Sequence, residues 1–381
     1  MAQALQHLRL ELDRFPEALR KHVDPASPPP MRMMAARAMV PMGPRELVSV
    51  LYQLTLDPEQ KIRESAQKSL EELPPDMIDG VIRQDLDPMV LDLLAVTNLE
   101  RDDRLEIIVT NHALSDLSMA YLAQHVSERI AEIIGGIHVR LLRHPAIIEA
   151  LYLNPRTRMS TVDKVLDLAR RNNVEFSGLP ALNDALASAD YYNKGQAESE
   201  LSDEEFARLA YESTASDDDA ETERIEALLE GEDQAKTPEE ERRMSRWQLL
   251  ERMNAAQKIR LALLGNREDR FVLLRDSRKV VHMAAIKSPK IGPGEAAQIA
   301  ASRNLPDGVI HHVAKARDWV RYYPVMLALV NNPKCPLADS MAFLKQLRPN
   351  DLKTLQRNKN VPTQLARQAQ VIARQKESVR G

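Results

Sequence analysis

Aromatic residues and glycine are scarce in this 381-residue chain. Phe, Trp and Tyr make up 4% of it, and glycine occurs 12 times. Large β-sandwiches need aromatic and β-branched strands joined by glycine turns, so this composition argues against them. Hydrophobic residues still reach 44%, enough to fill sizeable cores. The 23 prolines favour many short helices, because proline starts a helix well but cannot continue one. We therefore expect an all-α protein.

Signals for disulfides, export and membrane insertion are also missing. The chain has one cysteine, Cys335, so no disulfide and no cysteine-based zinc site can form within it. Its first residues lack a basic stretch followed by an apolar one, and no apolar run approaches 18 residues. We expect a cytoplasmic protein that does not bind the membrane.

No motif for catalysis or cofactor binding is evident. The one Gly-x-Gly, at residues 292–294, lacks the Lys-Ser/Thr of a phosphate-binding loop. The 9 histidines are scattered, and no His-Glu-x-x-His occurs. Cys335 follows Lys334 but has no visible base beside it, which is typical of an inert thiol. The sequence predicts no metal, no cofactor and no enzymatic activity.

Charge is distributed unevenly, although the whole chain is close to neutral. Between Glu198 and Glu241 there are 18 acidic and 3 basic residues, whereas residues 242–381 hold 27 basic and 10 acidic ones. An acidic, Ser/Asp-rich stretch cannot bury enough apolar surface to offset its ordering entropy. The predicted organisation is an N-terminal helix with a Pro-rich lead (1–43), a first helical repeat array (44–194), a largely disordered acidic linker (195–236) and a basic second array (237–381).

Two helix starts are predicted at the edges of the acidic stretch. Ser202 and Glu205 have the spacing of a capping box, which predicts a nascent helix inside the linker. Thr237, Pro238 and Glu240 predict the start of a long helix that continues to Leu264.

The segment from Asp57 to Leu70 carries the clearest helical signature. Ile62, Ala66 and Leu70 are spaced four residues apart and form one apolar stripe. Asp57 can cap this helix, with Pro58 at its first position. The segment resembles the second helix of a HEAT repeat, although a generic capped amphipathic helix has the same features.

Internal similarity favours repeats. Residues 261–266 match residues 327–332, and residues 285–290 align with 329–334, at spacings of 66 and 44 residues. The same ending occurs at Asn154-Pro155 and Asn332-Pro333. We interpret these as helices that end at an Asn in left-handed conformation, after which Pro blocks extension. Short helices of this kind would bury their apolar faces by stacking. The alternative is an irregular helical bundle in which the Asn-Pro stops are coincidental.

Residues 255–370 resemble an uncharacterised bacterial family of HEAT-like helical repeats. The resemblance is based on residues 258–268, 273–276, 317–319, 328–334, 351–353 and 358–362. It implies a HEAT-like α-solenoid without an assigned reaction, and it carries over no catalytic residue.

A basic and aromatic cluster in the C-terminal part is the candidate binding surface. Its members, with further bases nearby, are Arg317, Trp319, Arg321, Tyr322, Tyr323, Lys334, Lys353, Arg357 and Lys359. The first interpretation is a non-enzymatic scaffold that takes a protein partner, for which an acidic segment would fit. The alternative is nucleic-acid binding by residues 242–381, including a HEAT-like DNA glycosylase with Asp318 as its carboxylate.

Two further interpretations of this region remain open. The acidic linker could fold back onto the basic array, or the aromatic residues could simply pack between repeats.

Overall fold

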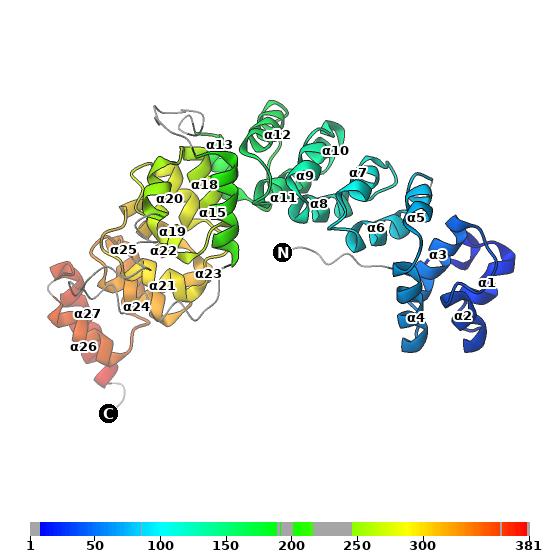
Figure 1. Ribbon diagram of the computed structural model, residues 1–381. Helices are drawn as coiled ribbons and strands as arrows, with labels where there is room; N and C mark the ends of the chain where they lie inside the picture. The colour runs from blue at the N-terminus through cyan, green and yellow to red at the C-terminus, as the bar shows by residue number, and fades with distance from the viewer. Residues whose placement is uncertain are drawn as a thin grey trace, which may run out of the picture. The chain divides into compact units, whose positions relative to one another are not determined.

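The computed structural model describes residues 8–84, 86–188, 191, 201–215, 246–358 and 360–378. Throughout these residues the secondary structure is helical, and none of them forms a strand, which confirms the all-α prediction. The chain divides into two compact units, Met1–Glu175 and Phe176–Gly381. Figure 1 shows the short helices of each unit following one another along the chain.

The first unit is built from short helices that pack in two rows. Its elements are η1 (Leu12–Arg14), α1 (Glu17–Val23), α2 (Pro29–Ala36), α3 (Pro44–Thr55), α4 (Gln60–Glu71), α5 (Pro75–Ile82), α6 (Pro88–Thr97), α7 (Asp102–Thr110), α8 (Asp116–His125), α9 (Glu128–Gly135), α10 (His138–Arg143), α11 (Ala146–Leu153) and α12 (Met159–Arg171). From α3 onward, α5, α7, α9 and α12 contact one another in succession, and so do α6, α8 and α11. Within each row a helix thus packs against the one two or three places along the chain.

The second unit contains the remaining helices. They are α13 (Pro180–Leu186), α15 (Asp203–Ala215), a helical stretch at 246–252, α18 (Ala255–Leu264), α19 (Arg267–Leu273), α20 (Lys279–Ile286), α21 (Pro293–Ala301), α22 (Asp307–Lys315), α23 (Arg317–Val320), α24 (Tyr323–Asn331), α25 (Leu337–Leu344), α26 (Pro349–Arg357) and α27 (Thr363–Ser378). α18, α19 and α20 pack on one another, α21 packs on α24, and α25 and α26 both pack on α27.

The α4 stripe lies where the spacing predicts. Ile62, Ala66 and Leu70 are all buried. Asp57, however, is not the N-cap of α4, because the helix begins at Gln60. Its carboxylate instead accepts the backbone N–H of Glu59 and forms a buried ion pair with Arg32 of α2. The predicted cap is therefore a link between two helices.

The Asn residues at helix ends differ from the prediction in conformation. Asn154 has φ −83° and Asn332 has φ −92°, so both are extended rather than left-handed. A left-handed Asn is found elsewhere, at Asn173 after α12, where φ is 52°. The Asn before Pro therefore does not use the conformational freedom that the sequence interpretation assigned to it.

These Asn side chains hydrogen-bond to an earlier helix end instead. Asn154 donates from Nδ2 to the carbonyls of Ala123 (2.9 Å) and Val126 (3.0 Å), while its Oδ1 accepts the N–H of Arg156. Asn332 donates in the same way to Ala300 (2.7 Å) and Ser302 (2.9 Å). Both amides are almost fully buried. Each satisfies carbonyls that the end of an earlier helix leaves without a partner, and so joins two helix ends.

The second unit begins earlier than the sequence predicts. α13, which was assigned to the first array, packs on α20 through Ala181, Leu182 and Ala185. The predicted linker also contributes to this unit, because α15 packs on α18 and buries Phe206 and Leu209. The largely disordered linker is thus wrong for residues 203–215, whereas residues 192–200 and 216–245 lie outside the described residues.

The expected helix start inside the linker is confirmed. Ser202 Oγ accepts the N–H of Glu205, and the Glu205 carboxylate accepts the N–H of Ser202. The helix holds because its apolar side faces α18, a tertiary contact that composition alone does not reveal.

The long helix predicted up to Leu264 is interrupted. Asn254 caps α18 through a capping box with Gln257, and the preceding helical stretch ends at residue 252. Leu250 and Met253 are buried, but Trp247 is 47% exposed. The stop at Gly265 is confirmed.

Buried ion pairs join the segments of the second unit. Arg246 binds the buried Asp269 of α19 through two bonds of 2.7 and 2.8 Å, and Ser213 of α15 donates to the same carboxylate. Arg270 forms a bidentate pair with Glu295 of α21.

Within the part of the chain that the structure describes, no helix has both the length and the apolar character needed to cross a bilayer.

Candidate binding surface

The predicted aromatic cluster is divided between two environments. Trp319 of α23 is half-buried, and its ring meets His312 edge-on at 6.0 Å. Burial, with a smaller effect of the Lys287 ammonium, lowers the pKa of His312. Trp319 is therefore partly a packing residue, as one of the two remaining interpretations proposed.

Tyr322 and Tyr323 are adjacent but differ in role. Tyr322 is 39% exposed, and the guanidinium of Arg321 lies 5.2 Å from its ring centre. The Tyr323 hydroxyl donates to Asp351 at the start of α26 and accepts the N–H of Arg348 at 2.9 Å. The Arg348 guanidinium lies 4.7 Å from the Tyr323 ring centre, within the range of a cation–π contact. Tyr323 therefore positions α26 against α24.

The predicted basic residues also have different roles. Lys334 donates from Nζ to the carbonyl of Leu305 (2.6 Å) and lies 3.6 Å from Asp307, so it joins the loop after α24 to the start of α22. Arg317 and Arg321 are exposed, and neither forms an ion pair with a described residue. Lys353 and Arg357 are exposed on α26. Lys359 lies outside the described residues.

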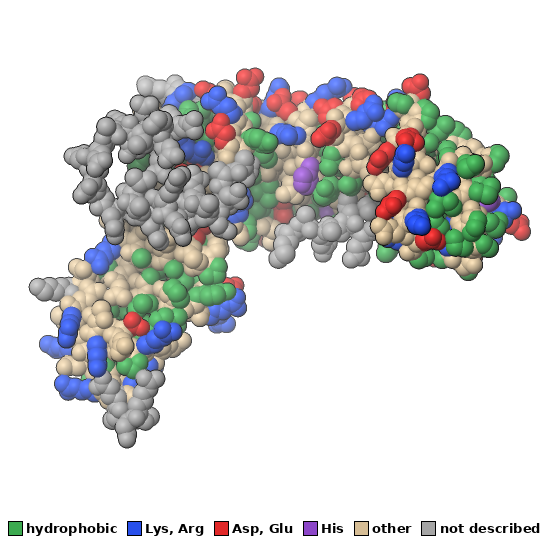
Figure 2. Space-filling view, turned by 60° about the horizontal axis from the view of Figure 1, so that its bottom comes forward, with side chains coloured by type: hydrophobic (Ala, Val, Ile, Leu, Met, Phe, Trp, Pro, Cys, Tyr) green, Lys and Arg blue, Asp and Glu red, His purple; other side chains and the backbone are tan. Residues whose placement is uncertain are grey.

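α26 presents a polar and cationic face. Asn350, Lys353, Thr354 and Arg357 are exposed at helical spacing, and they line a shallow hollow of about 360 Å³. Asp351 is half-buried, and its carboxylate accepts the Tyr323 hydroxyl. Figure 2 shows Lys and Arg side chains spread over the C-terminal end of the second unit, with few acidic ones among them.

The sequence interpretation missed several residues of this surface. Arg348, Asn350 and Thr354 lie on or beside α26, and Arg367 and Arg374 are exposed on α27. Their helical spacing was available as a signal, because 350, 353, 354 and 357 fall on one face of a helix that begins at Pro349. The sequence prediction was based on the aromatic residues, which lie on and beside α23 instead.

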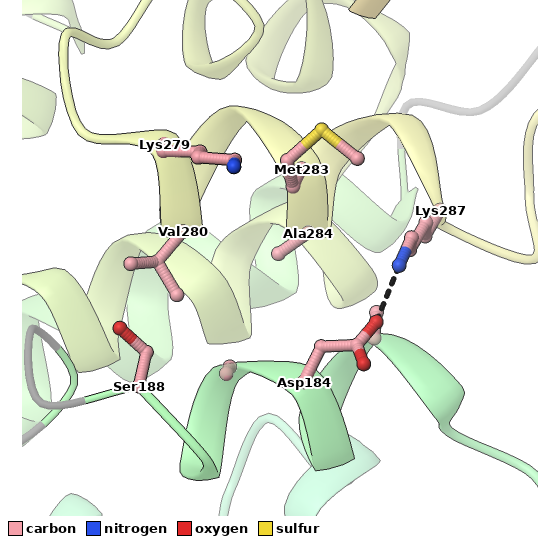
Figure 3. Close-up of a pocket in the computed structure, with 9 residues that line it drawn as sticks. Asp184, Ser188, Lys279, Val280, Met283, Ala284 and Lys287 are labelled. Atoms are coloured by element: carbon pink, nitrogen blue, oxygen red, sulfur yellow. Dashed lines mark hydrogen bonds and ion pairs between the residues drawn. The ribbon is translucent and has the colours of Figure 1, made fainter. Parts of the chain in front are cut away.

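The second unit has a hollow of about 370 Å³ between α13 and α20. Its floor includes Val280, Met283 and Ala284, and Lys279 lies at its edge. Lys287 pairs with Asp184 across it, as Figure 3 shows. The Ser188 hydroxyl also lines the hollow, and Asp184 is its one carboxylate, so it holds no carboxylate pair.

A larger hollow of about 820 Å³ lies in the first unit, among α3 to α7. Its buried Arg104 is fully engaged, donating to Asp79 (2.7 Å) and to Asn98 (2.8 Å).

Among the described residues, no group of three or more His, Cys, Asp or Glu side chains could hold a metal ion. Cys335 lies in the loop between α24 and α25, and burial raises the pKa of its thiol.

Comparison of the chain with protein-family models, with curated proteins and with solved structures finds no match.

Proposed function

We propose that this protein is a non-enzymatic scaffold of HEAT-like helical repeats that binds another macromolecule through its C-terminal surface. The observation that carries the proposal is the set of exposed arginines on α23, α26 and α27 that form no ion pair with a described residue. Arg321, Arg357 and Arg374 are all exposed and form no ion pair with any described residue. Unpaired cations gathered at one end of a domain attract an anionic partner from a distance.

The use of buried polar residues supports the non-catalytic part of the proposal. Asn154 and Asn332 join successive helix ends, and Arg270 pairs with Glu295 in the core. Polar side chains that hold repeats together are satisfied by the fold itself and are not held ready for a substrate.

The α-solenoid interpretation is supported by the two rows of helices in the first unit. Within each row contacts run from a helix to the one two or three places along, with short connections between the helices. In a solenoid each repeat contacts only its neighbours, and the surface serves for binding. A cytoplasmic location belongs to the same proposal.

Affinity capture with the full chain tests the proposal. A variant with Arg321→Glu, Lys353→Glu and Arg357→Glu reverses the charge of the surface, and Arg170→Glu with Arg171→Glu is the matched control on exposed arginines of α12. We expect a partner retained by the wild type and the control and lost by the surface variant, with unchanged helical circular dichroism in all three. Equal capture by the surface variant would overturn the proposal, and so would no specific capture by any of them.

A further inference from the structure

The exposed faces of the last two helices share an unusual composition. On α26 the face consists of Asn350, Lys353, Thr354 and Arg357. Lys353 and Arg357 are one turn apart, which places them about 6 Å apart along the helix axis. This face combines two cations with an amide and a hydroxyl.

α27 continues the same composition. Its exposed side chains include Arg367 and Arg374, two turns apart, with Gln364, Gln368 and Gln375 between and beside them. From Lys345 to Lys376 the one acidic residue is Asp351, and Tyr323 donates to its carboxylate. Lys376 donates to the carbonyls of Lys345 (2.7 Å) and Leu347 (2.8 Å), so it closes the end of α25 and adds little to the surface.

This chemistry favours a phosphate backbone over the other anionic partners. Contacts to phosphate and sugar come from Arg and Lys together with Ser, Thr, Asn and Gln. The core of a protein interface is instead enriched in aromatic and apolar residues, and the large apolar side chain exposed on these two helices is Val371. A helix that binds a lipid surface needs Trp, Phe or Leu on its buried face, which α26 and α27 do not expose.

The same faces favour a duplex over a single strand. Single-stranded nucleic acids are held largely by bases stacked on aromatic rings. The exposed faces of α26 and α27 carry no aromatic residue, and the nearest one, Tyr323, is engaged by Asp351 and Arg348. A duplex needs only donors and cations along a shallow surface, as the hollow on α26 provides.

We propose that the exposed faces of α26 and α27 bind the sugar-phosphate backbone of a nucleic-acid duplex without reading its sequence. This inference rests on the proposed scaffold function, because it names the partner of one of its surfaces. Lys353, Arg357, Arg367 and Arg374 neutralise phosphates, while the Asn350 amide donates a hydrogen bond to the sugar-phosphate backbone; the Thr354 hydroxyl donates to the Asn350 carbonyl of its own helix. The Arg317 and Arg321 segment is not needed.

Fluorescence anisotropy with the full chain and a labelled random-sequence DNA duplex tests it. Non-specific binding of this kind has a Kd of about 10⁻⁴ to 10⁻⁶ M at physiological salt. Four phosphate contacts predict a slope of log K against log salt of about −3.6, and Lys353→Gln with Arg357→Gln should reduce its magnitude by about 1.8. The same double variant should weaken binding by about tenfold at low salt, as should Arg367→Gln with Arg374→Gln.

Matched variants and competitors decide the outcome. Arg317→Gln with Arg321→Gln, and Arg170→Gln with Arg171→Gln, should leave duplex binding unchanged. A loss confined to the first of these would move the site to α23 and overturn the inference. Polyglutamate or anionic phosphatidylserine vesicles that bind more tightly than the duplex would also overturn it. If the duplex does not bind while the charge-reversal variant still loses a captured protein, this inference fails and the scaffold proposal stands; if both are negative, both fail.

Discussion

The first unit and the C-terminal end of the second unit differ in how many of their exposed arginines are paired. In the first unit, several exposed arginines pair with acids on neighbouring helices, as Arg129 does with Glu106 and Arg143 with Asp116, whereas others, such as Arg37, form no ion pair with a described residue. On α26 and α27, Arg357, Arg367 and Arg374 are exposed without an ion pair to any described residue. Helix ends are thus joined in similar ways in both units, while the first unit pairs more of its exposed arginines than α26 and α27 do. The difference separates what builds the fold from what is available for binding.

The start of the second unit lies between these extremes. There the cations are buried and paired, as in Arg246 with Asp269 and Arg270 with Glu295. Such pairs contribute little net stability compared with apolar packing. Removing one partner is nevertheless strongly destabilising, because it leaves the other charge buried and uncompensated. Exposed cations of the described residues 246–378 lie on α20 and α22, as Lys279 and Lys315 do, as well as on α26 and α27.

The largest expected effect comes from shortening the second unit. Residues 237–381 alone lack α15, whose Phe206 and Leu209 are buried, and Phe206 lies under the guanidinium of Arg260 at 5.2 Å. Losing two buried side chains of this size costs about 5 kcal/mol. We expect the fragment 176–381 to melt cooperatively and the fragment 237–381 to be much less stable or unfolded, as followed by circular dichroism. Equal melting temperatures would show that α15 is dispensable.

The next largest effect should come from removing the buried side chains of Asn154 and Asn332. The loss of stability should be similar in both units. Asn154→Ala and Asn332→Ala each leave two buried carbonyls without a donor, and we expect each to cost about 2 to 3 kcal/mol in urea unfolding. The control is Asn172→Ala, because Asn172 is exposed and donates only to Leu168 of its own helix. That change should cost about 0.5 kcal/mol or less. A small loss at Asn154 or Asn332 would mean that water replaces the amide.

Helix type and much of the core could be predicted from the sequence, because the signals are local. The stripe of Ile62, Ala66 and Leu70 is a property of spacing alone, and so is the capping box at Ser202 and Glu205. The recurrence of Asn before Pro was visible too, but its role was not. The hydrogen bonds of Asn154 join residues 28 and 31 positions apart, and no local pattern specifies which carbonyls need a donor.

Long-range packing explains what the sequence could not reveal. Composition predicts disorder for the acidic stretch, yet Phe206 is buried against α18. There the Arg260 guanidinium lies over the Phe206 ring, and Gln257 donates to the carbonyl of Leu201 just before α15. The candidate surface was predicted in part for the same reason. Arg317 and Arg321 are exposed as expected, whereas Lys334 and Tyr323 are held by partners about 28 residues away. Charge indicates which part of the chain binds, but tertiary contacts decide which of its cations are available.

Lowering the pH should reduce the free energy of unfolding through the buried ion pairs rather than through the surface cations. Burial alone would raise the pKa of Asp276, but hydrogen bonds from Arg278 and Lys258 outweigh it and lower that pKa to about 2. Because the folded pKa is below the unfolded value of about 3.9, the contribution of Asp276 is complete above about pH 4 and is lost as the pH falls toward 2. Asp276→Asn should therefore be less stable than the wild type at pH 6, and the two free energies of unfolding should converge toward pH 2. Curves that stay parallel would show that Asp276 is not the titrating group.

The smallest expected effect comes from replacing one exposed arginine in each of the two regions, Arg143 in the first unit and Arg367 on α27. Arg143→Gln removes two bonds of 2.7 Å to Asp116, and it should lower the urea midpoint slightly at low salt. The Arg143 hydrogen bond is also the main cause of the lowered pKa of Asp116. Because Arg143 is exposed, salt should weaken this loss. Arg367→Gln should leave the midpoint unchanged or raise it, since it relieves repulsion among cations that have no acidic partner. If Arg367→Gln destabilises the protein as much as Arg143→Gln does, the cations of α27 serve the fold, and the two ends of the molecule do not differ in the way inferred here.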